Sequence, residues 1–164
     1  MLRWALSGNA SLDGAPAAPG VSAVPAESSA ALFAAILEQM ADAVIYADAA
    51  GTIRLWNGAA AALFGYSAAE AVGRSLDLII PEHLRGSHWQ AFGTAMKSGV
   101  TRLQGRPTLT RATHQSGRKL YVEMTFALVE PPGGHARGAV AVARDVTERV
   151  EQQRAAARGQ APGA

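Results

Sequence analysis

Alternation of apolar and polar residues marks three strands in the second half of the chain. The clearest covers residues 119–129, where every second side chain is apolar: Leu120, Val122, Met124, Phe126 and Leu128. Residues 101–113 and 136–144 are also strand-like, and clusters of turn-forming residues separate the three runs. The pattern predicts three consecutive strands, of which the middle one has a wholly apolar inner face.

A hairpin is predicted in the first half of the chain. Residues 43–47 and 52–56 are short alternating runs joined by a turn that ends at Gly51. A helix should precede this hairpin, because Ser28 or Ser29 offers an N-cap and an apolar stripe follows at three-and-four spacing: Leu32, Phe33, Ile36, Leu37 and Met40. This one-sided stripe must dock on its own domain or on a second copy of the chain.

Short helices are predicted after the hairpin. Asn57 is suited to cap a helix that ends at Phe64, with Gly65 in a left-handed conformation. Ser67 starts another helix, because Ser67 and Glu70 have the spacing of a capping box.

A last helix is predicted from Asp145, since Asp145 and Glu148 place acceptors at the N-cap and N3 positions. Asp145 is also expected to hold a nearby cation, Arg144 or Arg149.

The longest predicted helix starts at residue 81, ends near Ser98-Gly99, and carries a histidine on its apolar face. At about 100° per residue, His88 lies at the centre of a stripe whose other members are Leu84, Ala91, Phe92 and Ala95. A buried imidazole needs a partner for at least one ring nitrogen, either a backbone carbonyl, as in most core histidines, or a metal. His83 lies on the polar side of this helix and is expected to be solvated.

Composition narrows the possible functions. The 164 residues suit one domain, and a net charge of +2 without a Lys/Arg cluster argues against direct nucleic-acid binding. The absence of cysteine excludes disulfides, thiolate metal sites, a cysteine nucleophile and a cysteinyl photoadduct. No nucleophile elbow, metal-binding histidine pair or phosphate loop is present, so an enzyme is not expected.

Apolar runs in the chain are too short for a membrane span, which needs about 18 residues, and residues 1–6 make a poor secretory signal. We therefore expect a cytoplasmic protein without a membrane anchor.

Two motifs resemble those of PAS sensor domains. Residues 56–74 are similar to the signature of that family, and Asp145-Val146-Thr147 is similar to the Asp-x-Thr motif that ends it. The resemblance covers roughly residues 30 to 148 and implies an α+β fold, a five-stranded antiparallel sheet with helices closing a cofactor cavity. The expected organisation is a disordered leader at 1–27, a PAS domain with an N-terminal flanking helix at 28–148, and a C-terminal helix and tail at 149–164.

A third motif points to a cofactor. Pro81-Glu82-x-x-Arg85-x-x-His88 resembles the haem-binding PAS domains of nitrogen-fixation oxygen-sensor kinases, in which the matching histidine is the proximal iron ligand. The resemblance implies haem b (iron protoporphyrin IX) with His88 on the iron. The resemblance does not extend to the following strand, where Thr108 occupies the position of an arginine that stabilises bound oxygen in that family. The nearby arginine is Arg106, which is two residues away and would share the strand face of Thr108.

Further pocket residues are expected on the strands. Leu103, Met124 and Phe126, with Val140 or Val142 from the last strand, should line the haem pocket. Met124 either packs in the core or ligates the iron opposite His88, as in similar haem PAS regulators that respond to carbon monoxide. The candidates for pairing with haem propionates, if they are not simply solvated, are Arg102, Arg106 and Arg111.

The resulting hypothesis is a haem-binding sensor of a diatomic gas (carbon monoxide, nitric oxide or oxygen) or of redox state. It would form a homodimer and signal through the Asp145–Arg149 junction to a separate effector protein. Two alternatives stay open: a cofactor-free PAS dimerisation or interaction module, and a flavin-binding redox sensor.

Overall fold

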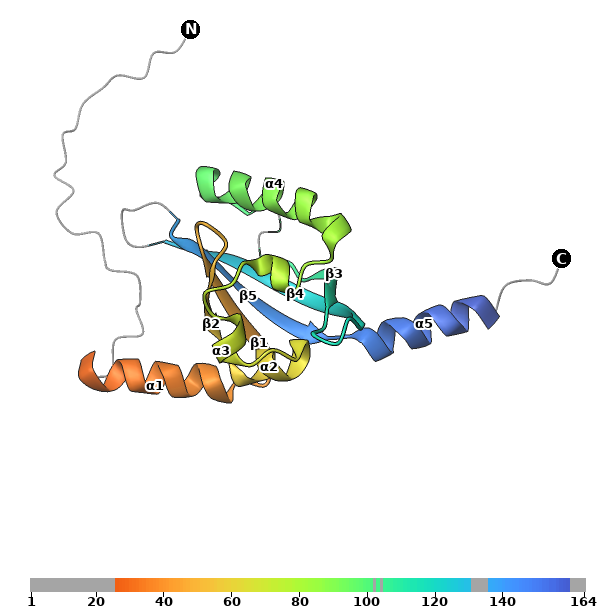
Figure 1. Cartoon of the computed structure of the whole chain (residues 1–164), viewed down its shortest axis with the longest axis horizontal. Helices are drawn as coiled ribbons and strands as arrows, with labels where there is room; N and C mark the ends of the chain where they lie inside the picture. The colour runs from red at the N-terminus through yellow and green to blue at the C-terminus, as the bar shows by residue number, and fades with distance from the viewer. Residues whose placement is uncertain (1–25, 102, 104, 131–135, 160–164) are drawn as a thin grey trace, which may run out of the picture.

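A computed structural model describes residues 26–101, 103, 105–130 and 136–159 of the chain (Figure 1). The strands of its sheet are β1 (Ala43–Asp48), β2 (Ile53–Trp56), β3 (Thr108–Thr113), β4 (Lys119–Val129) and β5 (Gly138–Asp145). The helices are α1 (Ala26–Gln39), α2 (Gly58–Phe64), α3 (Ala68–Ala71), the 3-10 helix η1 (Leu76–Leu78), α4 (Glu82–Ser98) and α5 (Thr147–Gly159). None of the helices in this part of the chain is long and apolar enough to cross a bilayer.

The sheet is antiparallel and has the order β2-β1-β5-β4-β3. Strand β5 therefore lies between β1 and β4, with Ala141 opposite both Ile45 and Phe126. Helices α2, α3, η1 and α4 connect β2 to β3, the two edges of the sheet, whereas α5 extends away from the end of β5 (Figure 1). The predicted α+β fold with a five-stranded antiparallel sheet is confirmed.

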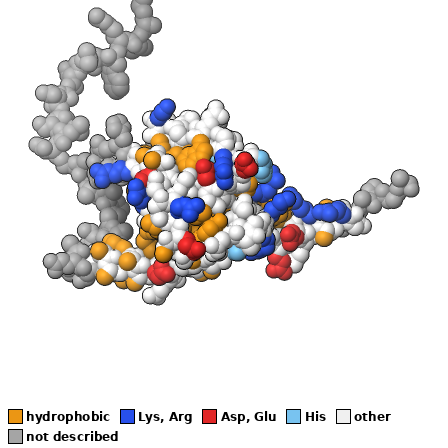
Figure 2. All heavy atoms as spheres, viewed as in Figure 1, with side chains coloured by type: hydrophobic (Ala, Val, Ile, Leu, Met, Phe, Trp, Pro, Cys, Tyr) orange, Lys and Arg blue, Asp and Glu red, His pale blue; other side chains and the backbone are white. Residues whose placement is uncertain are grey.

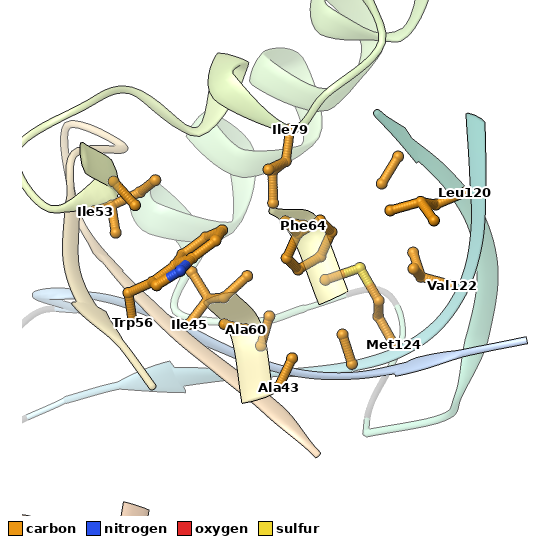
Figure 3. Packing of buried hydrophobic residues seen from close by; sticks show 14 residues of the cluster. Ala43, Ile45, Ile53, Trp56, Ala60, Phe64, Ile79, Leu120, Val122 and Met124 are labelled. Atoms are coloured by element: carbon orange, nitrogen blue, oxygen red, sulfur yellow. The ribbon is translucent and has the colours of Figure 1, made fainter. Parts of the chain in front are cut away.

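The core lies on one face of the sheet (Figure 3). Alternation along β4 turns Leu120, Val122 and Met124 to this face, as its pattern predicted. Phe64 of α2 is fully buried there, with its ring centroid 5.3 Å from that of Trp56. Strand β5 contributes only alanines to this face: Ala139, Ala141 and Ala143.

Asn57 joins three elements at the edge of the core. Its side-chain oxygen accepts hydrogen bonds from the backbone of Val44 and Ala60, both at 2.9 Å. Its amide nitrogen donates to the carbonyls of Leu37 (2.9 Å) and Asp42 (3.1 Å). The predicted cap of α2 is thus also the residue that ties α1 and β1 to that helix, and only 3% of Asn57 is exposed.

Several sequence-based boundaries match the structure. Helix α2 ends at Gly65 with φ 83°, the Ser67–Glu70 capping box is formed, and α4 ends at Gly99 with φ 68°. Strand β4 has the predicted bounds.

Other boundaries were wrong. Strand β3 begins at Thr108 instead of residue 101, because Gly105 adopts φ 72°, a turn closes from Leu103 to Arg106, and Pro107 has no N–H to donate. Helix α1 begins at Ala26, before the predicted caps at Ser28 or Ser29. Of the predicted leader, residues 1–25 lie outside the described residues.

The cation pairing predicted for Asp145 was also wrong. Its carboxylate accepts from the backbone N–H of Thr147, the first residue of α5, at 2.8 Å. Asp145 therefore lies one position before the N-cap that was predicted for it. Arg144 instead pairs with Asp42, and Arg149 pairs with Glu123. Both cations take a carboxylate from a neighbouring element.

We expect Asn57→Ala to lower the free energy of unfolding by about 2 to 4 kcal/mol, because it removes a helix cap and leaves buried backbone groups without partners. Urea denaturation measures this change. Asn57→Asp is the matched variant, because it keeps the acceptor oxygens and loses the two donated hydrogen bonds. Its free energy of unfolding should lie between those of wild type and Asn57→Ala. A stability of Asn57→Ala within about 0.5 kcal/mol of wild type would contradict the role given to Asn57.

Candidate functional site

A cavity of about 290 Å³ lies between α4 and the inner face of the sheet. Its floor consists of small and apolar residues of β1 and β5, including Ile45, Ala139 and Ala141. Its roof consists of Leu84, His88 and Phe92 of α4. The cavity exists because the alanines of β5 are too short to reach α4, in which none of the described side chains is fully buried.

His88 places a polar atom in this apolar environment. Its Nε2 is buried and has no hydrogen-bond partner, the one such side-chain atom found among the described residues. Leaving a buried polar atom unsatisfied costs about 1 to 3 kcal/mol. The alternative of a core histidine bonded through Nε2 to a backbone carbonyl is therefore not what the structure shows.

Burial lowers the pKa of His88, and the carboxylate of Asp77 partly offsets this by favouring the charged form. The imidazole is therefore neutral near neutral pH. A neutral imidazole has a lone pair available for a metal ion. His83 is exposed, as predicted.

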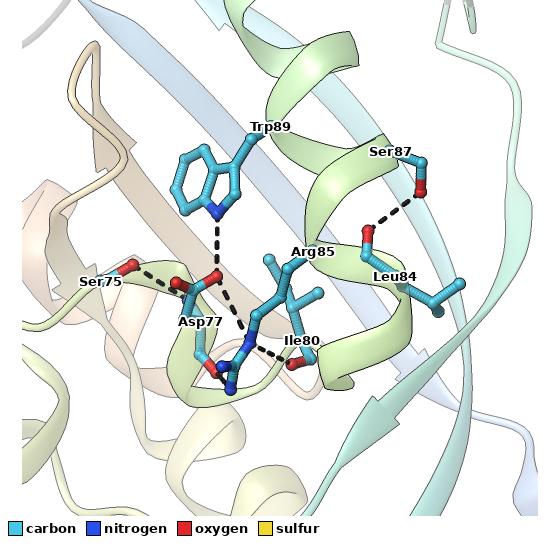
Figure 4. A network of polar contacts seen from close by, with 7 residues as sticks. All are labelled: Ser75, Asp77, Ile80, Leu84, Arg85, Ser87 and Trp89. Atoms are coloured by element: carbon cyan, nitrogen blue, oxygen red, sulfur yellow. Dashed lines mark hydrogen bonds and ion pairs between the residues drawn. The ribbon is translucent and has the colours of Figure 1, made fainter.

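Asp77 holds α4 in place over the sheet (Figure 4). Its carboxylate accepts a hydrogen bond from the indole of Trp89 at 2.9 Å and lies 3.6 Å from Nε of Arg85. The Arg85 guanidinium also donates to the carbonyls of Ile80 and Asp77. The Trp89 indole lies on Gly51, which leaves no space there for a side chain. We call Asp77, Arg85 and Trp89 the Asp77 clasp.

The residues next to the clasp form an aromatic group on α4. The His88 ring is edge-on to Trp89 at 5.0 Å between centroids and roughly parallel to Phe92 at 5.9 Å. The clasp and the contact with Trp89 together hold the imidazole in the roof of the cavity.

A second cavity, of about 180 Å³, lies beneath the C-terminal half of α4. Ala95, Met96, Leu103 and Leu128 contribute to its apolar lining. The two cavities share four lining residues, which stand between them: His88, Phe92, Phe126 and Ala139.

The structure brings most of the predicted site residues to these cavities. Thr108 and Met124 are paired across β3 and β4 and line the larger cavity with His88. Leu103 lines the smaller cavity and Phe126 lines both. Met124 is 8% exposed, and in Figure 3 its thioether points inward among the core side chains.

Three predicted positions were misplaced. Val140 and Val142 lie on the opposite face of the sheet, opposite Tyr46 and Val44, because the inward positions of β5 are its alanines. Arg106 is exposed in the turn before β3 and does not share a strand face with Thr108. Of the other propionate candidates, Arg111 lines the larger cavity, and Arg102 lies outside the described residues.

Sequence reasoning missed the floor of the site. Ala139 and Ala141 line the larger cavity, yet an alanine gives little periodic signal beside two valines. It also missed the Asp77 clasp, whose members are separated by connecting turns. The indole of a tryptophan needs an acceptor when it is half-buried, and this was the available signal.

The described residues contain no group of three or more His, Asp or Glu side chains that could hold a metal ion. A metal at His88 would have to bring most of its ligands with it.

A PAS fold model matches residues 31–146. The chain belongs to the PAS family. Among solved structures, this PAS domain is similar to one of a Colwellia psychrerythraea protein, with a TM-score of 0.64 and 22% identity over 74% of this chain and 99% of that one. It is also similar to an RNA-binding Light-Oxygen-Voltage receptor, with a TM-score of 0.64 and 23% identity over 85% of this chain and 39% of that one. At these identities the similarity shows the fold alone.

Curated relatives are similar to this PAS domain over short segments of their own length. An uncharacterized protein of Azorhizobium caulinodans is 34% identical over 74% of this chain. The oxygen sensor protein DosP of Escherichia coli is 24% identical over 62% of this chain. The sensor protein FixL of Bradyrhizobium diazoefficiens is 42% identical over 32% of this chain. The matches span 16%, 13% and 10% of those proteins.

We expect the ligand-free domain to lose stability as the pH falls below about 6.5, the ordinary pKa of histidine. The pKa of His88 is lower in the folded state, so the unfolded state takes up the proton first and acid favours unfolding. Stability is thus fully present above pH 6.5 and declines toward the folded pKa. Urea denaturation at several pH values should show a flatter profile for His88→Leu between about pH 5 and pH 7. An unchanged profile in that variant would refute the buried neutral imidazole.

Proposed function

We propose that this PAS domain binds haem b through His88 and senses a diatomic gas or the redox state of the haem iron. One observation carries the proposal: the buried, partnerless Nε2 of His88 at an apolar cavity between α4 and the sheet. A structural histidine would satisfy this atom within the protein.

The chemistry of the site favours haem over a bare metal ion. A single imidazole supplies one ligand, and the described residues offer no cluster to complete a coordination sphere. A porphyrin brings four nitrogen ligands of its own, so it needs the protein for an axial ligand and an apolar enclosure. When bound, haem supplies an iron coordination position for a diatomic gas and a one-electron redox couple.

The residues around the site determine which gas is favoured. Thr108, Met124 and Phe126 face the cavity. Arg111 contributes to its lining but is exposed and lies opposite Tyr121 on the outer face of the sheet, and Arg106 is exposed in the turn before β3. A mostly apolar pocket into which none of the described arginines points favours carbon monoxide or nitric oxide over stable oxygen binding. Met124 would be a sixth ligand only after its thioether turns away from the core, and a propionate would meet Arg111 only at the edge strand β3.

The relatives support a sensor role at the level of their names. DosP is named an oxygen sensor protein and FixL a sensor protein. We place the domain in the same broad class, as a sensory module and not a catalyst, which passes its signal to a separate effector.

The signal would leave through β4 and α5. Thr147 and Val146 hydrogen-bond to the backbone of Tyr121, and Arg149 pairs with Glu123 at 3.0 Å. Arg154 lies over the Tyr121 ring, 4.6 Å from its centroid. Because Tyr121 and Glu123 alternate along β4 with residues of the inner face, a shift of Met124 or Phe126 moves the residues that hold α5.

A cofactor-free dimerisation module is the second candidate, and α1 favours it. Leu32, Phe33 and Ile36 remain 43%, 41% and 49% exposed, and Figure 2 shows hydrophobic side chains at the surface over this helix. A second copy of the chain would cover this stripe. Dimerisation through α1 is compatible with haem binding, so the candidates differ in whether a cofactor is needed.

We expect the domain, expressed with adequate haem supply, to show a sharp Soret band that His88→Ala abolishes. His83→Ala is the matched control, because it removes an exposed histidine of the same helix and should leave the spectrum unchanged. A ferrous spectrum altered by Met124→Ala would identify Met124 as the sixth ligand. Absorption spectra of the ferric, ferrous and carbon monoxide forms measure all three effects.

A wild-type protein without a Soret band, or a His88→Ala variant with an unchanged one, would refute the haem proposal. A colourless protein that dimerises in wild type and becomes monomeric in Ile36→Asp would then establish the interaction module. A yellow protein would point to the flavin sensor.

We expect carbon monoxide binding to the haem-loaded domain to change amide hydrogen exchange at the start of α5. Thr147→Val removes the side-chain hydrogen bond to Tyr121 and should reduce this change by at least about half, while the Soret band is retained. Arg158→Ala, at the exposed end of α5, is the control. An undiminished exchange response in Thr147→Val would contradict the route through Tyr121.

A further inference from the structure

We propose that the two cavities beneath α4 are halves of one flat binding slot. The ring of Phe92 is the movable partition between them, and it must turn aside before a ligand wider than one cavity can bind. This inference rests on the proposed haem function, because it concerns how a ligand as wide as a tetrapyrrole enters the site.

The partition is defined by four residues that line both cavities. His88 and Phe92 come from α4, one helical turn apart, and Phe126 and Ala139 come from β4 and β5. The larger cavity lies on the η1 side of this partition and the smaller one toward the C-terminal end of α4. His88 therefore stands at the middle of the combined space.

The size of each half argues that neither serves such a ligand alone. The larger cavity, at about 290 Å³, is at the lower limit for a small-molecule site, and the smaller is well below it. A planar ligand centred on His88 extends to both sides of it. Both halves must therefore be open to each other when the slot is filled.

Phe92 is the member of the partition that is free to move. Ala139 has no rotatable side chain, and Phe126 of β4 packs against the hydrophobic core cluster. His88 is next to Trp89, which the Asp77 clasp holds. Phe92 is half-buried on a helix without a fully buried side chain, and Gly93 and Ala95 beside it leave its ring room to turn.

The ring contacts of Phe92 set the resistance to opening. It packs on His88 at 5.9 Å and edge-on to Trp89 at 5.6 Å, and each such pair contributes a factor of about 2 to 10 to an equilibrium constant. Turning the ring breaks both contacts. Narrow ligands that fit one half would not meet this barrier.

The experiment measures the association rate of metal-free protoporphyrin IX by its fluorescence, beside that of hemin by absorbance. Protoporphyrin IX has the width of haem but cannot be ligated by His88. We expect Phe92→Ala to accelerate association of both porphyrins at least about fourfold, because neither ring contact then has to be broken, and Phe92→Trp to slow it.

Two variants separate the partition from other effects. Gln90→Ala shortens an exposed side chain of α4 that lines neither cavity, and Phe33→Ala removes a phenyl ring from exposed α1. Both should associate at the wild-type rate. Equal rates for Phe92→Ala and wild type, or an acceleration by Gln90→Ala as large as that by Phe92→Ala, would overturn the proposal.

The outcomes also distinguish this proposal from the haem function. If protoporphyrin IX binds faster to Phe92→Ala while hemin gives no His88-dependent Soret band, the slot is supported and the haem proposal is refuted. If hemin binds through His88 at a rate that does not depend on Phe92, the haem proposal is supported and the partition is refuted. If neither porphyrin binds wild type or Phe92→Ala, the slot is refuted.

Discussion

The Asp77 clasp is the interaction on which the cavity depends. Helix α4 has no fully buried side chain among the described residues, so apolar packing alone holds it weakly to the sheet. The hydrogen bond from Trp89 and the ion pair with Arg85 anchor its N-terminal half to η1, and the indole also rests on the turn at Gly51. The result is a helix held above the sheet at one end, with space beneath it.

The alanines of β5 complete this arrangement. A larger residue at position 139 or 141 would fill the space that the clasp keeps open, and the sheet would then pack against α4 directly. The neighbouring valines are on the opposite face, so the strand has bulk on the outside and none over the cavity. Polar anchoring above and small residues below therefore keep an apolar space open, with His88 in its roof.

Connections to the rest of the domain follow from the strand order. Strand β4 contributes Met124 and Phe126 to the site on its inner face and holds α5 through Tyr121 and Glu123 on the other. Helix α1 is tied to β1 and α2 by Asn57, at the other end of the sheet. The cavity with His88, helix α5 and the apolar stripe of α1 thus share one sheet.

The sequence by itself determined the elements and the local signals: the alternation of β4, the cap at Asn57, the turns at Gly65 and Gly99, and His88 on an apolar helix face. These features depend on neighbours a few residues apart, where periodicity and backbone conformation are informative. Only the tertiary structure decided which face of β5 meets α4 and that Arg106 precedes β3. It also decided that Arg144 forms its ion pair with Asp42 and not with Asp145. It also decided that His88 Nε2 has no partner, because a cavity is the absence of contacts between distant elements and no local pattern specifies it.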